Sequence, residues 1–174
     1  MLKMIFNTLL FASLLFLFTS CQSGKPTKDI PAVTNFKLEN YLGQWYEIAR
    51  LPHSFERNID YVTATYTIRK GRVIVINQGR KEGKEVSVQG YARLKDNPHI
   101  GELEVSFFRP FYGDYRIIEL APDYSHAVIT SSTKNYFWIL ARTSKMSPEL
   151  QQQLIAKAKA WGFNIEKLEF PKQK

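Results

Sequence analysis

The side chains able to do acid–base, metal or nucleophilic chemistry stand apart from one another in this chain of 174 residues. The histidines, His53, His99 and His126, are separated by segments with turn or strand character. The sequence contains no Ser-His-Asp order, metal-ligand spacing or glycine-rich phosphate loop around them. We therefore interpret each histidine as a surface or hydrogen-bonded residue, and we expect neither a metal nor a cofactor.

Cys21 is the residue whose context predicts a specific chemistry. It is the single cysteine, so a disulfide within the chain is impossible. Lys3 and the apolar run from Leu9 to Phe18 have the composition of a secretory signal peptide, and the run is too short to span a bilayer as a mature helix.

The residues around Cys21 resemble the bacterial lipobox, although Phe18 replaces the usual leucine. The resemblance implies that a signal peptide of residues 1–20 is removed and that the cysteine is acylated. Gln22, in place of aspartate, resembles lipoproteins that are sent to the outer membrane. A plain secretory signal and an uncleaved anchor are the alternatives.

Residues 21–35 are polar and contain prolines, which predicts a lipidated flexible tether. Residues 36–174 are sufficient for one domain with a single core. The formal net charge is +8, but the basic residues are scattered between acids without an arginine-rich run. This pattern disfavours nucleic acid and favours a solvated surface or one that faces anionic lipid.

Strand-like segments separated by turn residues dominate the domain. Eight such segments with short hairpins predict an all-β fold, an antiparallel up-and-down barrel, because closure removes exposed strand edges. The predicted strands are 44–51, 61–69, 72–78, 85–94, 102–108, 114–120, 126–131 and 135–142.

The C-terminal part changes its periodicity. Ser147 and Pro148 form a helix start, Gly162 a stop, and the apolar positions between them recur on one face. This predicts a helix packed on the outer wall of the barrel. Alternation over 164–170 predicts a ninth edge strand.

The predicted inward faces combine small residues with large rings, which favours a cavity over a solid core. Alternation places Ala49, Ala64, Gly90 and Ala92 inward. A void in a close-packed core costs on the order of 24 cal/mol per Å³, so empty volume that persists suggests room for a ligand.

Three ordered motifs resemble the signatures of the lipocalin family. Gly43-Gln44-Trp45-Tyr46 resembles the first signature, Pro122-Asp123-Tyr124 the second with proline in place of threonine, and Trp138 to Arg142 the third. Other segments resemble the bacterial outer-membrane lipoprotein branch and, more distantly, apolipoprotein D. The similarity covers Phe36 to Phe170.

The resemblance implies a barrel open at one end that carries a small hydrophobic molecule. For the lipoprotein branch it points to a fatty acid or lysophospholipid, in a protein anchored to the outer membrane of a bacterial cell as a monomer or homodimer. It also implies structural roles for Gly43, Trp45, Asp123, Tyr124 and Arg142, with Arg142 in a cation–π contact with Trp45 worth about 0.5 to 2 kcal/mol.

Candidate ligand-binding residues combine the expected inner wall with one residue of the long loop before the second strand. They are Phe55, Val62, Ala64, Tyr66, Val105, Phe107, Tyr115, Ile117 and Trp138. Arg93 and Arg109 are candidates for binding a ligand head group.

Three other functions are alternatives to a lipid carrier. A haem- or bilin-binding barrel is one, since histidines accompany an apolar barrel, and a structural envelope lipoprotein with a solid interior is another. Some lipocalins are enzymes that use a cysteine nucleophile, but here the single thiol of Cys21 is assigned to the anchor, so we expect no enzyme.

Overall fold

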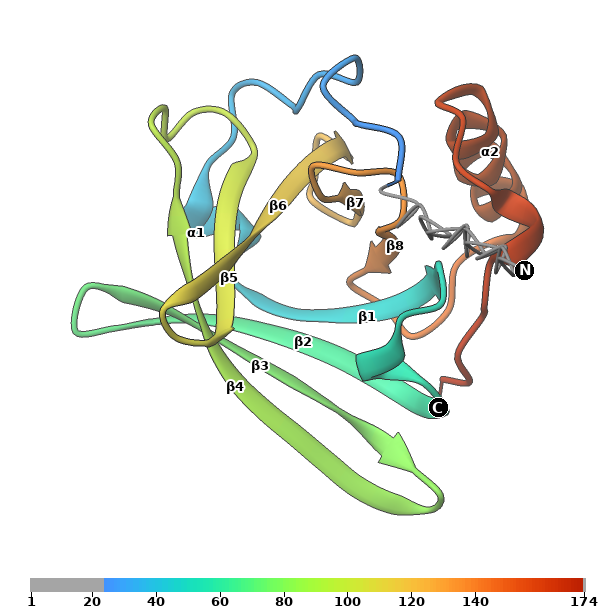
Figure 1. The fold of residues 1–174 in the computed structure, drawn as a ribbon, viewed down its shortest axis with the longest axis horizontal. Helices are drawn as coiled ribbons and strands as arrows, with labels where there is room; N and C mark the ends of the chain where they lie inside the picture. The colour runs from blue at the N-terminus through green and yellow to red at the C-terminus, as the bar shows by residue number, and fades with distance from the viewer. Residues whose placement is uncertain (1–23, 174) are drawn as a thin grey trace, which may run out of the picture.

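The computed structural model describes residues 24–173, and these contain one closed antiparallel barrel (Figure 1). Each strand pairs with the next, and the last pairs with the first. This confirms the predicted eight-stranded up-and-down barrel, whereas the predicted signal peptide and Cys21 lie outside the described residues. The strands are β1 Gly43–Arg50, β2 Ile59–Arg69, β3 Arg72–Lys81, β4 Lys84–Leu94, β5 Glu102–Phe108, β6 Phe111–Leu120, β7 His126–Thr130 and β8 Phe137–Ala141.

Two-residue turns set the register of the longest hairpins. Between β2 and β3, Lys70 and Gly71 both have positive φ, at 51° and 71°, and between β3 and β4 Glu82 and Gly83 have φ of 51° and 79°. Positive φ at both central residues is typical of the turn that matches the strand twist. Because a glycine occupies the second position, only one side chain in each turn takes the unfavourable conformation.

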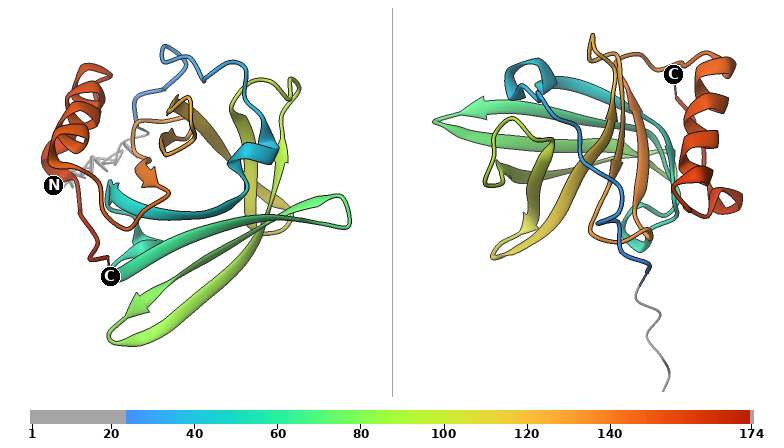
Figure 2. Two further views of the ribbon diagram at one scale, coloured as in Figure 1. Left: turned by 180° about the vertical axis from the view of Figure 1, so that it is seen from behind. Right: turned by 90° about the horizontal axis from the view of Figure 1, so that it is seen from above.

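Helix α2, Pro148–Ala160, lies on the outside of the barrel as predicted (Figure 2). The Ser147 hydroxyl accepts a hydrogen bond from the Leu150 backbone N–H at 3.2 Å, which caps the first turn. Leu154 and Ala158 are buried in an outer apolar cluster with Ile48 and Phe137. No helix in the described part of the chain is long and apolar enough to cross a bilayer.

The predicted ninth strand is wrong. Residues Ile165–Lys167 form a 3₁₀ helix, η2, and pairing with the barrel is limited to a single bridge between Arg50 and Glu169. Their backbones exchange two hydrogen bonds of 3.0 and 2.8 Å. β2 pairs with β1 only from Gly43 to Tyr46, so the side of β1 that faces Glu169 is open only at its last residues, and the C-terminal segment bonds there at Arg50 alone.

The segment expected as a flexible tether contacts the barrel wherever it is described. The backbone N–H of Thr27 donates to Ser132 O at 3.0 Å, and that of Val33 donates to Ile117 O at 2.9 Å. Arg116 donates to Thr27 O at 2.7 Å and to Ile30 O at 2.8 Å. The part of the segment from residue 24 onward is therefore fastened along the wall.

A short helix that the sequence did not predict, α1 Leu38–Tyr41, closes one end of the barrel. Its Tyr41 is fully buried beside Trp45 at the centre of the inner core cluster. A further turn, η1 Ser54–Glu56, lies in the loop between β1 and β2 at the opposite end. The two ends therefore differ: α1 plugs one, and the loop that contains η1 lies at the other.

The prediction that Ala49 points into the barrel is wrong. The pairing of β1 with β8 shifts between Glu47 and Ala49, which marks a β-bulge. Ala49 is consequently buried in the outer cluster beneath α2 rather than in the inner one. A bulge inserts one residue and reverses the alternation that follows it, which returns Arg50 to the inner side.

Candidate ligand site inside the barrel

The interior of the barrel contains a cavity of about 850 Å³ that opens at the end opposite α1. Of the predicted wall residues, the structure places eight along it: Phe55, Val62, Ala64, Tyr66, Val105, Phe107, Tyr115 and Trp138. Ile117 is not among the lining residues, because it is fully buried in the core cluster around Trp45. The cavity contradicts the alternative of a solid barrel.

Small residues on the inner wall determine where the cavity has room. Gly90 pairs with Val75 and faces inward, and a Cβ built on it would lie 2.7 Å from the ring of Phe107. The glycine therefore allows this ring to lie flat against the wall instead of projecting into the space. Ala64 also lines the cavity, whereas Ala92 belongs to the core beneath it.

The closed end is sealed by Trp45. Its indole N–H donates to the Tyr41 carbonyl at 2.8 Å, and the guanidinium of Arg142 lies 3.9 Å from its ring centroid. Arg142 also donates to Gln44 O at 2.9 Å and to Asn40 O at 2.8 Å. The predicted cation–π contact is confirmed, and the same arginine ties α1 to β1.

The second signature forms a turn in spite of its proline. The backbone N–H of Ser125 donates to the Asp123 carboxylate at 3.0 Å, and that of Tyr124 donates to Ala121 O at 2.8 Å. The Tyr124 hydroxyl accepts from the backbone N–H of Lys37 at 2.9 Å, which joins the turn to the segment before α1. Asp123 and Tyr124 thus hold the closed end without a hydroxyl at position 122.

Three tyrosine hydroxyls meet at the floor of the cavity. The Tyr66 hydroxyl donates to that of Tyr115 at 2.9 Å, and the hydroxyls of Tyr115 and Tyr41 are 2.6 Å apart. Burial raises the pKa of Tyr66 to about 12 and raises the pKa values of Tyr41 and Tyr115 well above the ordinary value. The floor is therefore neutral, and its hydroxyls are the hydrogen-bonding groups beneath an apolar wall.

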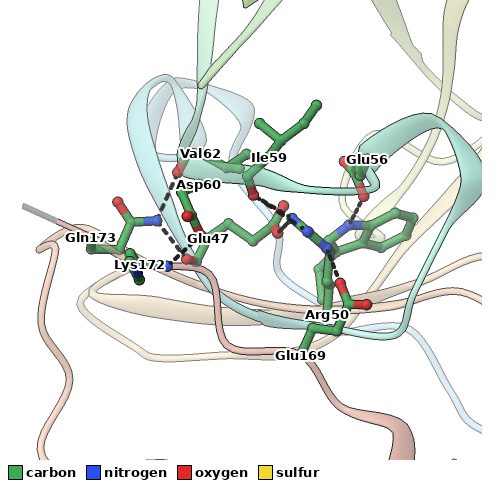
Figure 3. Close-up of polar contacts among 10 residues, drawn as sticks. Glu47, Arg50, Glu56, Ile59, Asp60, Val62, Glu169, Lys172 and Gln173 are labelled. Atoms are coloured by element: carbon green, nitrogen blue, oxygen red, sulfur yellow. Dashed lines mark hydrogen bonds and ion pairs between the residues drawn. The ribbon is translucent and has the colours of Figure 1, made fainter. Parts of the chain in front are cut away.

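An ionic cluster lies beside the open end (Figure 3). The Glu47 carboxylate accepts from the Arg50 guanidinium at 2.7 Å, and Arg50 also donates to Glu169 at 3.0 Å. On the cavity wall, the Glu56 carboxylate accepts from the Trp138 indole N–H at 3.1 Å. The cluster connects the inner wall to the C-terminal segment, where the Gln173 amide donates to Glu47 O at 2.7 Å.

Two of the carboxyl groups that line the cavity, those of Glu47 and Glu56, titrate abnormally. Burial and the nearby Glu56 raise the pKa of Glu47 to about 8, although Arg50 acts in the opposite direction. Burial also raises the pKa of Glu56. Burial and the repulsion between neighbouring carboxylates both favour the protonated form of these two groups, which keeps the wall closer to neutral.

His53 belongs to an aromatic cluster at the rim. Its ring stacks on Phe55 and on Tyr136, with centroid distances of 5.2 and 4.9 Å, and lies 4.8 Å from Trp138. Its Nε2 is buried without a hydrogen-bond partner in the structure. Burial, together with the positive charge of Arg50, lowers the pKa of His53 to about 4, so the ring is neutral at pH 7.

The two arginines expected near a ligand head group are not on the cavity wall. Arg93 is an outward residue of β4, ion-paired with Glu104 at 2.6 Å and 4.2 Å from the ring centroid of Tyr112. Arg109, in the turn between β5 and β6, lies 4.1 Å from the ring centroid of Tyr91. Alternation from the inward Gly90 and Ala92 explains why Arg93 and Tyr91 face outward.

Several of the lining residues that sequence reasoning missed are polar. Glu47, Glu56 and Asn77 all face the cavity. Alternation from Trp45 would have placed Glu47 inside, but a carboxylate on an inner wall contradicts the simple rule that apolar residues face in. The remaining histidines, His99 and His126, are not at the cavity, and the described residues contain no cluster of three His, Cys, Asp or Glu side chains that could hold a metal.

A closed barrel with an apolar cavity that opens at one end defines the class of small β-barrel proteins that enclose hydrophobic ligands. The chain belongs to the lipocalin-like family, whose domain model matches residues 36–173. It is 44% identical over 161 residues to the outer membrane lipoprotein Blc of Citrobacter freundii, covering 91% of each chain.

More distant proteins share the fold. The chain is 35% identical over 157 residues to apolipoprotein D of Rattus norvegicus, covering 81% of each chain. Among solved structures, insecticyanin of the tobacco hornworm superposes with a TM-score of 0.70 at 15% identity, covering 87% of this chain and 88% of that one. This last similarity supports the fold alone.

Proposed function

We propose that this protein is a lipid-anchored carrier that binds one single-chain amphiphile, a fatty acid or lysophospholipid, inside the barrel. The observation that carries the proposal is the cavity of about 850 Å³, whose wall is dominated by apolar and aromatic side chains. Its size lies within the range of about 300 to 1,000 Å³ that is typical of small-molecule sites. Burial of an acyl chain there is favourable by about 25 cal/mol per Å².

The proposed anchor is the acylated Cys21, and the proposed location is the outer membrane of a bacterial cell. The lipobox-like residues before Cys21 support the anchor. The relatives named outer membrane lipoprotein support the location. Replacement of Cys21 by serine is expected to release the protein from the membrane fraction, and unchanged fractionation would contradict the anchor.

We propose binding without catalysis. None of the described histidines lines the cavity, and the carboxyl groups of Glu47, Glu56 and Asp114 are engaged with Arg50, Trp138 and Lys95 rather than presented as a free acid and base. No histidine, cysteine or methionine of the described chain lines the cavity, and the Tyr66 and Tyr115 hydroxyls bond to each other, so the wall gives no particular support to haem. Turnover of an ester or isomerisable lipid would contradict this part of the proposal.

Fluorescence titration tests the ligand class. A chain that begins at Gln22 is titrated with a fluorescent 18-carbon fatty acid and, separately, with lysophospholipid as a competitor. We expect saturable binding of one molecule per chain, and we expect Trp138→Ala to weaken it. If neither class saturates, the carrier function is wrong, and a Soret band that one His→Ala change abolishes would instead support a tetrapyrrole.

A further inference from the structure

We propose that the open end of the barrel docks onto the membrane that carries the anchor, so that the cavity mouth faces lipid. The docking surface, here called the rim, consists of Phe55, Phe108, Arg109, Phe111 and Tyr136. This inference rests on the proposed lipidation of Cys21 but not on the identity of the ligand. Three observations support it: the path of the N-terminal segment, the distribution of exposed apolar side chains and the charges beside them.

The described chain begins at the open end. Pro26 forms a bridge with Thr133, and the backbone N–H of Lys134 donates to Lys25 O at 2.7 Å. The β7–β8 loop that receives these bonds also supplies Ser131 and Ser132 to the cavity wall. In the right-hand view of Figure 2, the blue start of the described chain lies on the same side as the β5–β6 turn.

The distance from this point to the anchor is limited by covalent geometry. Cys21 precedes Gly24 by three residues, and an extended chain advances at most about 3.6 Å per residue, which gives about 11 Å. The closed end is much farther away, because β3 alone contains ten residues at about 3.3 Å each. An anchor at Cys21 therefore holds the open end, not the closed end, next to the bilayer.

The attachment point cannot swing to the other end of the barrel. Thr27 is fully buried, its hydroxyl donates to Ser131 O at 2.5 Å, and its carbonyl accepts from Arg116 at 2.7 Å. Ile30 is also buried and receives a second bond from Arg116. The segment that follows the proposed anchor is thus part of the rigid barrel wall.

Exposed apolar side chains are concentrated around the mouth. Phe108 and Phe111 are 79% and 77% exposed, and Phe55 is 61% exposed, yet all three line the cavity entrance. Elsewhere on the described surface, the large apolar side chains with comparable exposure are Ile68 and Phe170. A cluster of this kind in water is unfavourable unless it contacts an apolar partner, and aromatic rings suit the bilayer interface.

Charge complementarity favours lipid as that partner. Arg109 stands between the two phenylalanines in the β5–β6 turn, and Arg57 is exposed in the β1–β2 loop that carries Phe55. The β3–β4 turn exposes Lys81 and Lys84 together with Glu82 and Glu85, so it adds no net charge. Cations next to an apolar surface are attracted to anionic head groups, while the exposed phenylalanines can enter the apolar part of the bilayer. A surface that only faces water would gain nothing from exposed phenylalanines. In the docked orientation an acyl chain passes from the bilayer to the cavity without crossing water.

The lone cysteine makes a direct test possible. Because lipidation consumes the thiol of Cys21, a cysteine introduced elsewhere is the single free thiol of the mature chain. Full-length Phe108→Cys and Phe111→Cys report from the rim. Asp96→Cys, in the exposed turn between β4 and β5 at the closed end, is the matched control. Each lipidated protein is labelled with an environment-sensitive fluorophore and reconstituted in vesicles of phosphatidylethanolamine and phosphatidylglycerol with acyl-brominated lipid.

The proposal predicts that brominated lipid quenches both rim labels at least about threefold more strongly than the Asp96→Cys label, since interfacial side chains reach about 5 to 10 Å into the bilayer. Equal quenching of the rim labels and the Asp96→Cys label overturns the proposed orientation, whether the quenching is weak at both ends or strong at both ends. Protein that does not float with the vesicles contradicts the anchor itself. Flotation with equal quenching instead removes only the orientation and leaves the carrier function standing.

Discussion

The carboxylate of Glu47 lies 2.7 Å from the guanidinium of Arg50, and each side chain is only 4% exposed. This buried pair lies between the cavity and the C-terminal segment. It therefore contributes both to the wall of the ligand site and to the stability of the fold. A buried pair costs desolvation, and that cost is repaid only when both partners are present.

Removal of Arg50 should therefore destabilise the barrel strongly. We expect Arg50→Ala to lower the free energy of unfolding by about 3 kcal/mol or more, because the buried Glu47 carboxyl and the Ile59 carbonyl both lose the donor that they bond to. Urea unfolding followed by tryptophan fluorescence measures the loss. Arg80→Ala is the control, since the Arg80–Glu85 pair is 3.5 Å long and largely exposed and should cost less than about 1 kcal/mol. Similar losses in the two variants would contradict a structural role for the buried pair.

Glu47 should make the protein less stable as the pH rises toward 8. Its pKa is raised from 4.5 in the unfolded chain to about 8 in the fold. The folded state therefore binds the proton more tightly, and the resulting stability is fully present below pH 4.5 and lost as the pH rises through 8. We expect a decrease of at least about 1 kcal/mol between pH 6.5 and 8.5 in the wild type. Glu47→Gln should flatten this decrease, and an unchanged slope would refute the assignment.

His53 should act in the opposite direction on the acid side. Its pKa falls from 6.5 when unfolded to about 4 when folded, so its contribution is present above pH 6.5 and lost as the pH falls toward 4. As the pH falls through that range, the stability lost through His53 offsets the stability gained through Glu47. His53→Phe keeps the stacking on Phe55 and Tyr136 but cannot take up a proton. Its free energy of unfolding, relative to that of the wild type, should therefore rise by about 2 kcal/mol as the pH falls from 6.5 to 4. The same urea titrations measure it, and parallel pH profiles for the two proteins would rule out His53 as the source.

Alternation along the strands was sufficient to predict the barrel, and eight of the nine candidate ligand-binding residues line the cavity. The inward positions of β2 and β5, such as Ala64 and Phe107, follow directly from period two once the hairpin turns are recognised. Period two identifies the face of a residue but not its depth along the barrel axis. For this reason Ile117, on the correct face, belongs to the core at the closed end and not to the cavity.

The parts that could not be predicted depend on contacts between distant residues. The bulge after Glu47 changes the direction of Ala49 and Arg50, and single-sequence alternation contains no signal for it. The pairing of Arg50 with Glu169 joins residues 119 positions apart. Likewise the fastening of Thr27 by Arg116 converts a polar, proline-containing segment into part of the wall, although its composition is that of a linker.

Filling part of the cavity should weaken binding without unfolding the barrel. Ala64 of β2 lines the cavity next to Trp45 on the paired strand, and its neighbour Thr65 points to the outer face of the same strand. We expect Ala64→Phe to weaken the binding of an 18-carbon fatty acid at least about tenfold, because the new ring occupies space that the acyl chain needs. Thr65→Phe adds the same ring outside and should leave the affinity within about twofold. Fluorescence titration measures both affinities, and urea unfolding verifies that both variants are folded. Undiminished binding by a folded Ala64→Phe variant would show that the ligand occupies another part of the molecule.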